Sequence, residues 1–317
     1  MRLKVIIKSC QNFLPRFLKS CDPTLTDDLI DRAVGLFWVN AFACSNGGGQ
    51  AVFPTFSFMS HSCAPNCTHS VFPNKTLALQ AKMNISAGTE FTISYISPLQ
   101  GLIKRRMKLH DKWFFDCSCD RCSDPTELGS FTSALLCQVC AVPEAYMVSE
   151  ASRDATAPWK CVKCGLKLPA EEVNKAETKV AMESQKLDTQ SLADFEIFLE
   201  QVSLSLHPHH YLVILLKRHL VGLYSKELPQ LENEKLEQVK HYAEEVEAVY
   251  QIIDPGFQKD RGTMLRALCD IHKLLAKRYF NEGKETDEQF AVRVKKCCQF
   301  FQDSQVRKHP ARFVTLF

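Results

Sequence analysis

The sequence predicts an α+β protein in which a small β-rich core and two cysteine clusters precede an all-helical C-terminal region. Three observations support this prediction. Residues 68–95 alternate like strands and contain turn residues, cysteines gather in two clusters between residues 117 and 164, and apolar side chains recur at helical spacing beyond about residue 170. The length of 317 residues and the hydrophobic content of 45% allow two or three domains.

Composition argues against several classes of function. The chain has 39 basic and 36 acidic residues without a block of like charge, so we expect no direct nucleic-acid binding. The longest clean apolar run in the later helices, residues 211–216, is far shorter than the ~20 residues of a membrane span. Lys8 interrupts the apolar part of the N-terminus, which argues against a signal peptide. The fifteen cysteines therefore indicate metal ligands and buried thiols rather than disulfides.

Local signals give the order of the elements before the clusters. Residues 1–50 are predicted to be mainly helical, with a second helix that begins near Thr26 as its N-cap. The glycines at 47–49 end this part. A hairpin with strands at 70–72 and 77–79, a turn at 86–88, the alternating FTISY segment and a helix over 102–113 are expected to follow.

Beyond residue 170 no strand signal remains. In the segment that begins at Asn233, apolar residues follow the three-and-four spacing of one helix face. Pro208 and Pro255 each precede a new helical stretch, which suggests stacked antiparallel helix pairs of the TPR kind. Core packing is the ordinary explanation for such apolar stripes.

The second group of cysteines has a spacing typical of a structural zinc site. Two C-x-x-C pairs separated by twenty residues allow four thiolates to converge, and a closed four-thiolate site is scaffolding rather than catalytic. The predicted ligands are Cys137, Cys140, Cys161 and Cys164.

The first group, CSCDRC, offers Cys117, Cys119 and Cys122, and needs a fourth ligand from elsewhere in the chain. Cys63 in the segment MSHSCAPNC is a plausible donor, although spacing alone leaves several cysteines open. The same segment could instead hold a nucleophile with His61 as its base, but no carboxylate lies near to orient that histidine.

Three motifs in order resemble a known family. MSHSCAPNC at 59–67, GTEFTISY at 88–95 and WFFDCSCDRC at 113–122 resemble the core and post-SET motifs of SET-domain lysine methyltransferases. Within that class the sequence is similar to the SET and MYND (SMYD) family. The four-cysteine ribbon and the segment LHPHHYLVILLKRHL are most similar to its arthropod-specific branch. The resemblance covers roughly residues 30–300.

The resemblance implies roles for individual residues. It makes Cys63 the fourth post-SET zinc ligand, so that the chain would hold two structural zinc ions. Tyr95 matches the active-site tyrosine. The residues implied to bind S-adenosylmethionine are Asn40, Ser60, His61, Tyr95 and Phe115. Asn66 matches an asparagine that makes structural hydrogen bonds within the threaded motif.

Two positions depart from the family pattern, and the resemblance implies an earlier region. Ser60 stands where an asparagine is usual, and Trp113 stands where a second pocket tyrosine is usual. The first SET strands with their Gly-x-Gly cofactor loop, and the MYND zinc module, are expected before residue 1. We therefore predict an N-terminally truncated member, with doubtful cofactor binding and activity.

The domain prediction combines both sources. It places a helical remnant of the SET insert at 1–45, the later part of the SET core at 46–112, the post-SET zinc segment at 113–125, the zinc ribbon at 126–170 and a TPR-like helical domain at 171–317.

Two functions stay open on the sequence. The first is methyl transfer from S-adenosylmethionine to a lysine of a histone or another protein. The alternative is an inactive, zinc-stabilised adaptor or transcriptional repressor that contacts other proteins, for example a histone deacetylase complex. In either case we expect a monomer in the cytoplasm and nucleus.

Overall fold

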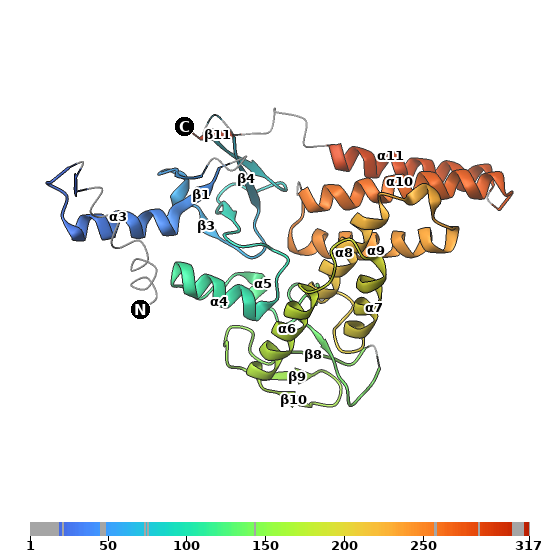
Figure 1. Ribbon diagram of the computed structural model, residues 1–317, viewed down its shortest axis with the longest axis horizontal. Coiled ribbons are helices and arrows are strands. Elements are labelled where there is room, and N and C mark those ends of the chain that lie inside the picture. Colours follow the sequence, from blue (N-terminus) through green and yellow to red (C-terminus); the bar gives the residue numbers. More distant parts are fainter. Residues whose placement is uncertain are drawn as a thin grey trace.

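The computed structural model has a β-rich part, a small cysteine-bearing sheet and a stack of helices (Figure 1). It describes residues 19–20, 22–44, 49–72, 74, 76–142, 144–256, 259–284, 286–305 and 314–316. The first helix expected within residues 1–18, and part of the GGG break and of the hairpin turn, lie outside these ranges. None of the described helices is long and apolar enough to cross a bilayer.

The β-rich part contains the predicted helix after Thr26 and also three short strands before residue 68 that the sequence analysis did not predict. Helix α3 (Asp27–Asn40) begins at the predicted cap, where Thr26 Oγ1 accepts a hydrogen bond from the Leu29 N–H at 3.2 Å. The short strands β1 (Ala41–Ala43) and β2 (Gln50–Val52) pair antiparallel. A 3-10 turn, η2 (Phe56–Phe58), leads into β3 (Ser60–His61), which pairs parallel with β6 (Thr92–Ile93).

The predicted hairpin forms part of a three-stranded sheet. Strands β4 (Cys67–Val71) and β5 (Leu77–Ala81) pair antiparallel, and a third strand, β11 (Val314–Leu316), joins the other edge of β5. The prediction that no strand follows residue 170 is wrong for this short segment. A strand of three residues is too short to show an alternating pattern in the sequence. Its pairing with β5, more than 230 residues earlier, is also not visible from local signals.

The cysteine clusters lie around short helices and a four-stranded sheet. Helix α4 (Leu102–Trp113) has the predicted bounds and is followed by the single-turn α5 (Asp120–Ser123). The sheet has the order β10-β9-β8-β7 and is antiparallel throughout. Its strands are β7 (Leu135–Leu136), β8 (Tyr146–Ser149), β9 (Trp159–Cys161) and β10 (Lys167–Leu168).

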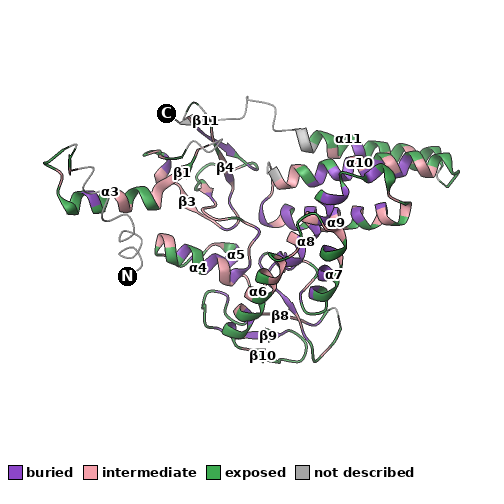
Figure 2. Cartoon of the chain, viewed as in Figure 1, coloured by how far each residue is buried: buried purple, intermediate pink, exposed green. Residues whose placement is uncertain are grey.

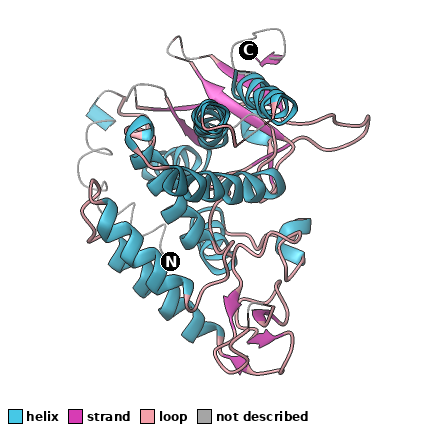
Figure 3. Cartoon of the chain, turned by 90° about the vertical axis from the view of Figure 1, so that its right-hand side faces the viewer, coloured by secondary structure: helices cyan, strands magenta, loops and turns pink. Residues whose placement is uncertain are grey.

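The remaining chain is helical, and from residue 192 onward consecutive helices pack on one another in a stack (Figures 1 and 3). The helices are α6 (Ala170–Ser184), α7 (Leu192–Ser203), α8 (Tyr211–Tyr224), α9 (Asn233–Ile253), α10 (Lys259–Asn281) and α11 (Asp287–Gln305), with a 3-10 turn, η3 (Leu228–Gln230), before α9. The apolar stripe of α9 is buried, as predicted (Figure 2). The main core is continuous from α9 to Trp159 of the small sheet.

A buried ion pair fastens the helical stack to the β-rich part. Lys82, just after β5, contacts Asp254, just after α9, and the two side chains are 3% and 0% exposed. Gly256 has φ +85°, and a Cβ there would lie 2.3 Å from the Lys82 carbonyl oxygen. The backbone after α9 is therefore pressed directly against the end of β5.

We expect Asp254→Asn to lower the free energy of unfolding by about 3–5 kcal/mol, because it leaves a buried ammonium without its counter-charge. Urea unfolding measures this loss. The matched control is Asp270→Asn, which removes the carboxylate of an exposed pair with Arg266 and should cost less than about 1 kcal/mol. Equal losses in the two variants would contradict the interpretation, as would a Lys82→Met, Asp254→Leu double variant no more stable than Asp254→Asn.

Candidate cofactor site and cysteine clusters

The segment MSHSCAPNC is held by a crossing of two chain segments. The Ser62 N–H donates to the Ile93 carbonyl oxygen at 3.0 Å, which extends the parallel pairing of β3 with β6. Asn66 then bonds β6 and the residues before it through its carboxamide. Its Oδ1 accepts the Thr92 N–H at 2.8 Å, and its Nδ2 donates to the Glu90 carbonyl oxygen at 2.8 Å. These are the structural hydrogen bonds that the family resemblance implied for Asn66.

His61 connects the crossing to the first cysteine cluster. Its Nδ1 accepts the Tyr95 N–H at 3.0 Å, and its Nε2 lies 3.3 Å from Cys63 Sγ. Burial is the main cause that lowers the pKa of His61 to about 4, so the ring is neutral at pH 7. Because Nδ1 faces a donor, the ring proton is on Nε2 and points to the sulfur.

This geometry argues against a nucleophilic Cys63. The imidazole nitrogen that faces the thiol carries a proton and cannot accept another. Cys63 is also fully buried, whereas reactive cysteines are partly exposed.

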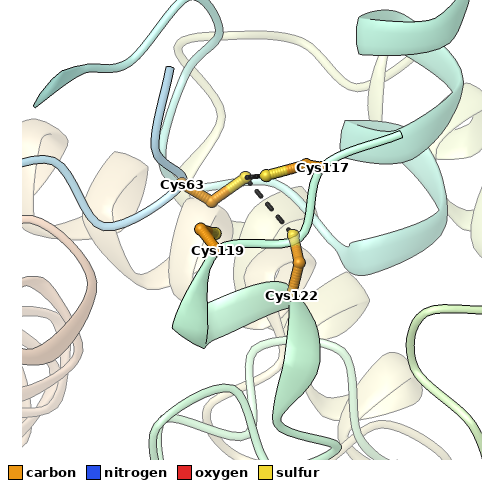
Figure 4. Close-up of side chains that lie close together, drawn as sticks. All are labelled: Cys63, Cys117, Cys119 and Cys122. Atoms are coloured by element: carbon orange, nitrogen blue, oxygen red, sulfur yellow. Dashed lines mark hydrogen bonds between the residues drawn. The ribbon is translucent and has the colours of Figure 1, made fainter. Parts of the chain in front are cut away.

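The first cysteine cluster brings together segments 54 residues apart (Figure 4). Its four sulfur atoms lie within 4.8 Å of one another, and three of the four residues are buried. Cys63 Sγ is 4.0 Å from Cys117 Sγ and 3.4 Å from Cys122 Sγ. Zn–S bonds of ~2.3 Å in a tetrahedron place sulfurs about 3.8 Å apart, so this donor set fits zinc. The fourth member is Cys119.

The four thiols of the second cluster also converge. The sulfurs of its four cysteines also lie within 4.8 Å of one another, with Cys137 Sγ 3.7 Å from Cys164 Sγ. Cys161 Sγ accepts the N–H groups of Lys163 and Cys164 at 3.4 and 3.5 Å. Gly165, with φ +75°, continues this backbone turn, in which the amides point toward the Cys161 sulfur. The remaining member is Cys140.

Beneath the first cluster lies a buried charge network that the sequence analysis missed. Arg105 Nη2 is 3.7 Å from Cys122 Sγ, and Arg121 Nη1 donates to the Cys63 carbonyl oxygen at 3.2 Å. Both arginines pair with Glu127, and all three side chains are at most 1% exposed. Burial raises the pKa of Glu127, but the two guanidiniums outweigh it and hold the pKa at about 2. Glu127 is therefore charged and pairs with both arginines, and its single charge offsets one of their two positive charges.

An aromatic group stands beside the crossing. The Tyr95 ring lies 5.1 Å from the His61 ring, 5.2 Å from Trp113 and 6.5 Å from Phe115, measured between centroids. The Tyr95 hydroxyl donates to the Met59 carbonyl oxygen, and burial together with Glu90 raises its pKa, so it stays protonated. Trp113 Nε1 donates to the Val39 carbonyl oxygen at 2.9 Å and thereby joins the end of α4 to the end of α3.

Next to this group is a cavity of about 250 Å³ at the ends of α3, η2, β6 and α4. Asn40, Tyr95 and Trp113 line it, while His61 and Phe115 pack on Tyr95. The structure thus brings together four of the five predicted cofactor residues. Ser60 differs, because its hydroxyl bonds to a carboxylate oxygen of Glu90.

A lysine that the sequence analysis did not single out also lines this cavity. Lys112 Nζ lies 4.4 Å from the centroid of the Trp113 ring and 5.8 Å from that of Trp38. These are cation–π distances, and partial burial lowers the pKa of Lys112. The Trp113 ring thus already makes a cation–π contact within this chain.

Comparison with known proteins identifies the β-rich part. A family model for the SET domain matches residues 7–96. The chain is 27% identical over 243 residues to the SET domain-containing protein SmydA-8, isoform B, of Drosophila melanogaster, an alignment that covers 72% of this chain and 54% of the relative.

Two further relatives bear the names of histone-lysine N-methyltransferases. ASHR1 of Arabidopsis thaliana is 26% identical over 74% of this chain and 47% of its own length. SMYD3 of Homo sapiens is 39% identical over 87 residues, which are 26% of this chain and 20% of the relative. This chain spans about half the length of the relatives that it matches most broadly.

We predict that the zinc-loaded chain holds two zinc ions and that each cluster holds one of them. Cys117→Ser and Cys161→Ser should each lower the zinc content, measured by elemental analysis, from two ions to one. Cys298→Ser is the matched control, since Cys298 is exposed and belongs to neither cluster. A content near zero in the unaltered protein would contradict the prediction. So would a content that Cys117→Ser leaves unchanged.

Proposed function

Because this chain carries a SET domain related to those of the SMYD proteins, we propose that it is a protein-lysine N-methyltransferase that uses S-adenosylmethionine. The observation that supports this most directly is the cavity that joins Asn40, Tyr95 and Trp113. Aromatic faces, a carboxamide and a protonated hydroxyl there suit a cationic cofactor and an amine substrate.

Each side chain has a distinct role in this proposal. Asn40, His61, Tyr95 and Phe115 contribute to the cofactor site, and Tyr95 is the catalytic residue that orients the substrate amine. When bound, S-adenosylmethionine supplies an electrophilic methyl group. The eight clustered cysteines hold two structural zinc ions, and the ion of the first cluster orders the segments that carry Tyr95 and Phe115.

The environment of the cavity favours a reactive amine. A lysine must lose its proton before it can act as a nucleophile, and both desolvation and a nearby positive charge lower its pKa. The aromatic side chains make part of the cavity wall apolar, and the ammonium of Lys112 supplies such a charge. Alignment within the cavity lowers the barrier further, because a well-oriented pair of reactants avoids an entropic cost.

The proposed substrates are lysine side chains of histones or of other proteins. The relatives SMYD3 and ASHR1 carry histone-lysine methyltransferase names, which supports this choice. A histone substrate is in keeping with nuclear action, and we propose cytoplasmic substrates as well. We also propose that the chain acts as a monomer.

Calorimetric titration with S-adenosylmethionine, followed by transfer of a labelled methyl group to mixed histones, tests the proposal. We expect Tyr95→Phe to retain cofactor binding and to lose roughly 100-fold in transfer rate, because the ring stays while the hydroxyl that orients the amine is lost. Tyr146→Phe in the small sheet is the control. Absence of heat at high micromolar cofactor, from a folded and zinc-loaded sample, would contradict the proposal.

Ser60 offers a second test of the cofactor site. We expect Ser60→Asn to strengthen cofactor binding by roughly 1–3 kcal/mol, since a carboxamide provides both a donor and an acceptor where the serine hydroxyl is bonded to Glu90. Ser70→Asn, at an exposed position of β4, should change nothing. Equal affinity of the Ser60→Asn variant and the unaltered chain would place position 60 outside the cofactor site.

A further inference from the structure

A second cavity, of about 710 Å³, lies between α4, the small sheet's 152–158 loop and the start of α6, away from the residues assigned above. Apolar side chains form part of its lining, namely Ile103, Met107, Ala155, Pro169 and Ala170. Met107 and Ala155 are exposed to solvent, so the cavity is open and can be entered. Helices α4 and α6 hold two of its walls in place.

Polar and charged side chains form the rest of the wall, including His110, Thr156 and Asn174. Three carboxylates line the cavity, those of Asp111, Asp116 and Glu171, against the single guanidinium of Arg106. Asp116 lies 3.4 Å from Arg106 and is 65% exposed, while Glu171 is 76% exposed and pairs with the exposed Lys175. The Glu171–Lys175 pair is exposed on both sides and therefore weak, so that a ligand can replace Lys175. Asp116 contacts the buried Arg106 but leaves most of its own side chain exposed. The wall therefore favours a ligand that is positively charged.

Two polar atoms at the wall lack hydrogen-bond partners within the described chain. Arg106 is 6% exposed, and its Nε has no acceptor, although its terminal nitrogens contact Ser152 and Asp116. Asn174 Oδ1 is likewise buried and has no donor. Buried polar atoms are normally paired. A peptide backbone offers a carbonyl oxygen as acceptor for Arg106 Nε–H and an N–H as donor to Asn174 Oδ1. Both bonds could form once the two side chains rotate toward the cavity.

From this lining we infer that the cavity binds a basic peptide segment with interspersed apolar side chains. The aliphatic stem of a lysine or arginine covers the apolar floor, and its charged end reaches the carboxylates. The peptide backbone bonds to Arg106 and Asn174. This ligand complements the apolar surface, the net negative charge and the unpaired donor and acceptor together.

The location points to a substrate segment as the occupant, and this part of the inference rests on the proposed function. Ile103, Arg106, His110 and Trp113 recur on one face of α4, and Trp113 lines the candidate methyl-transfer cavity. Seven residues of helix separate Arg106 from Trp113, a rise of about 10 Å. An extended peptide covers that distance in about three residues. The basic side chain would therefore flank the methylated lysine.

Binding is tested without cofactor, so that its outcome is separate from that of methyl transfer. A fluorescein-labelled eight-residue peptide of alternating Lys and Leu is titrated with the full, zinc-loaded chain, and an alternating Glu and Leu peptide is the comparison. We expect saturable binding of the basic peptide, weakened by salt, and at least about ten-fold weaker binding of the acidic one. No saturable binding of the basic peptide would overturn the inference.

Variants identify the cavity as the place of binding. Glu171→Gln should weaken binding about two- to five-fold, whereas Glu183→Gln, which removes the carboxylate of another exposed pair on α6, should not. Ala155→Trp fills the cavity and should weaken binding roughly ten-fold or more. Ala151→Trp, at an exposed position of the same loop region outside the cavity, is its control. Unchanged affinity in both Glu171→Gln and Ala155→Trp would overturn the inference.

A spectroscopic measurement on the unaltered chain locates the bound peptide without relying on variants that could misfold. In the unaltered chain with ¹³C-methyl methionine, we expect the basic peptide to shift the Met107 signal, because that side chain lines the cavity. Met182 on α6 is also exposed but lies outside it, and its signal should stay in place. A shift confined to Met182, or no shift at peptide saturation, would locate binding elsewhere and reject this cavity.

Discussion

The convergence of four thiols from two distant segments is the constraint on which the candidate site depends. Cys63 lies in the crossing of β3 and β6, and its three partners lie beyond α4. One four-thiolate centre therefore fixes the end of α4 against the crossing. Tyr95 and Phe115 belong to these two segments, so the distance between their rings depends on the centre. His61 strengthens the link, because its ring bonds to Tyr95 on one side and contacts Cys63 on the other.

The charges around this centre balance one another in a way that a bare cysteine motif does not reveal. Four thiolates and one Zn²⁺ would carry a net charge of about −2. Arg105 and Arg121 are fully buried beside them, and Glu127 offsets one of the two positive charges. Each of these ions would be costly alone in the interior. The thiolate centre and the arginines therefore stabilise each other.

Much of this fold could be predicted from the sequence, because the patterns that specify these elements are local. The Thr26 cap, the bounds of α4 and both C-x-x-C pairs depend on residues within a few positions of each other. Cys63 needed the family resemblance, since spacing alone does not choose among distant thiols. The network around Glu127 could not be predicted. A buried arginine looks like a surface arginine until the fold places a carboxylate beside it.

Contacts between residues far apart in the chain are not visible in the sequence, and for this reason the sequence analysis did not connect the helical stack with the candidate site. Lys82 and Asp254 are 172 residues apart, yet they form a buried pair. The Lys82 N–H also donates to the Asn66 carbonyl oxygen at 2.8 Å, and the Asn66 side chain holds Thr92 of β6, three residues before Tyr95. The helical stack is thus connected to the crossing through Lys82, whose side chain contacts Asp254 and whose backbone bonds to Asn66. Because Gly256 leaves no space between the two parts, a displacement of the stack would have to move the end of β5 with it. The helices therefore belong to the structural support of the candidate site, and they also form one wall of the acidic cavity beside it.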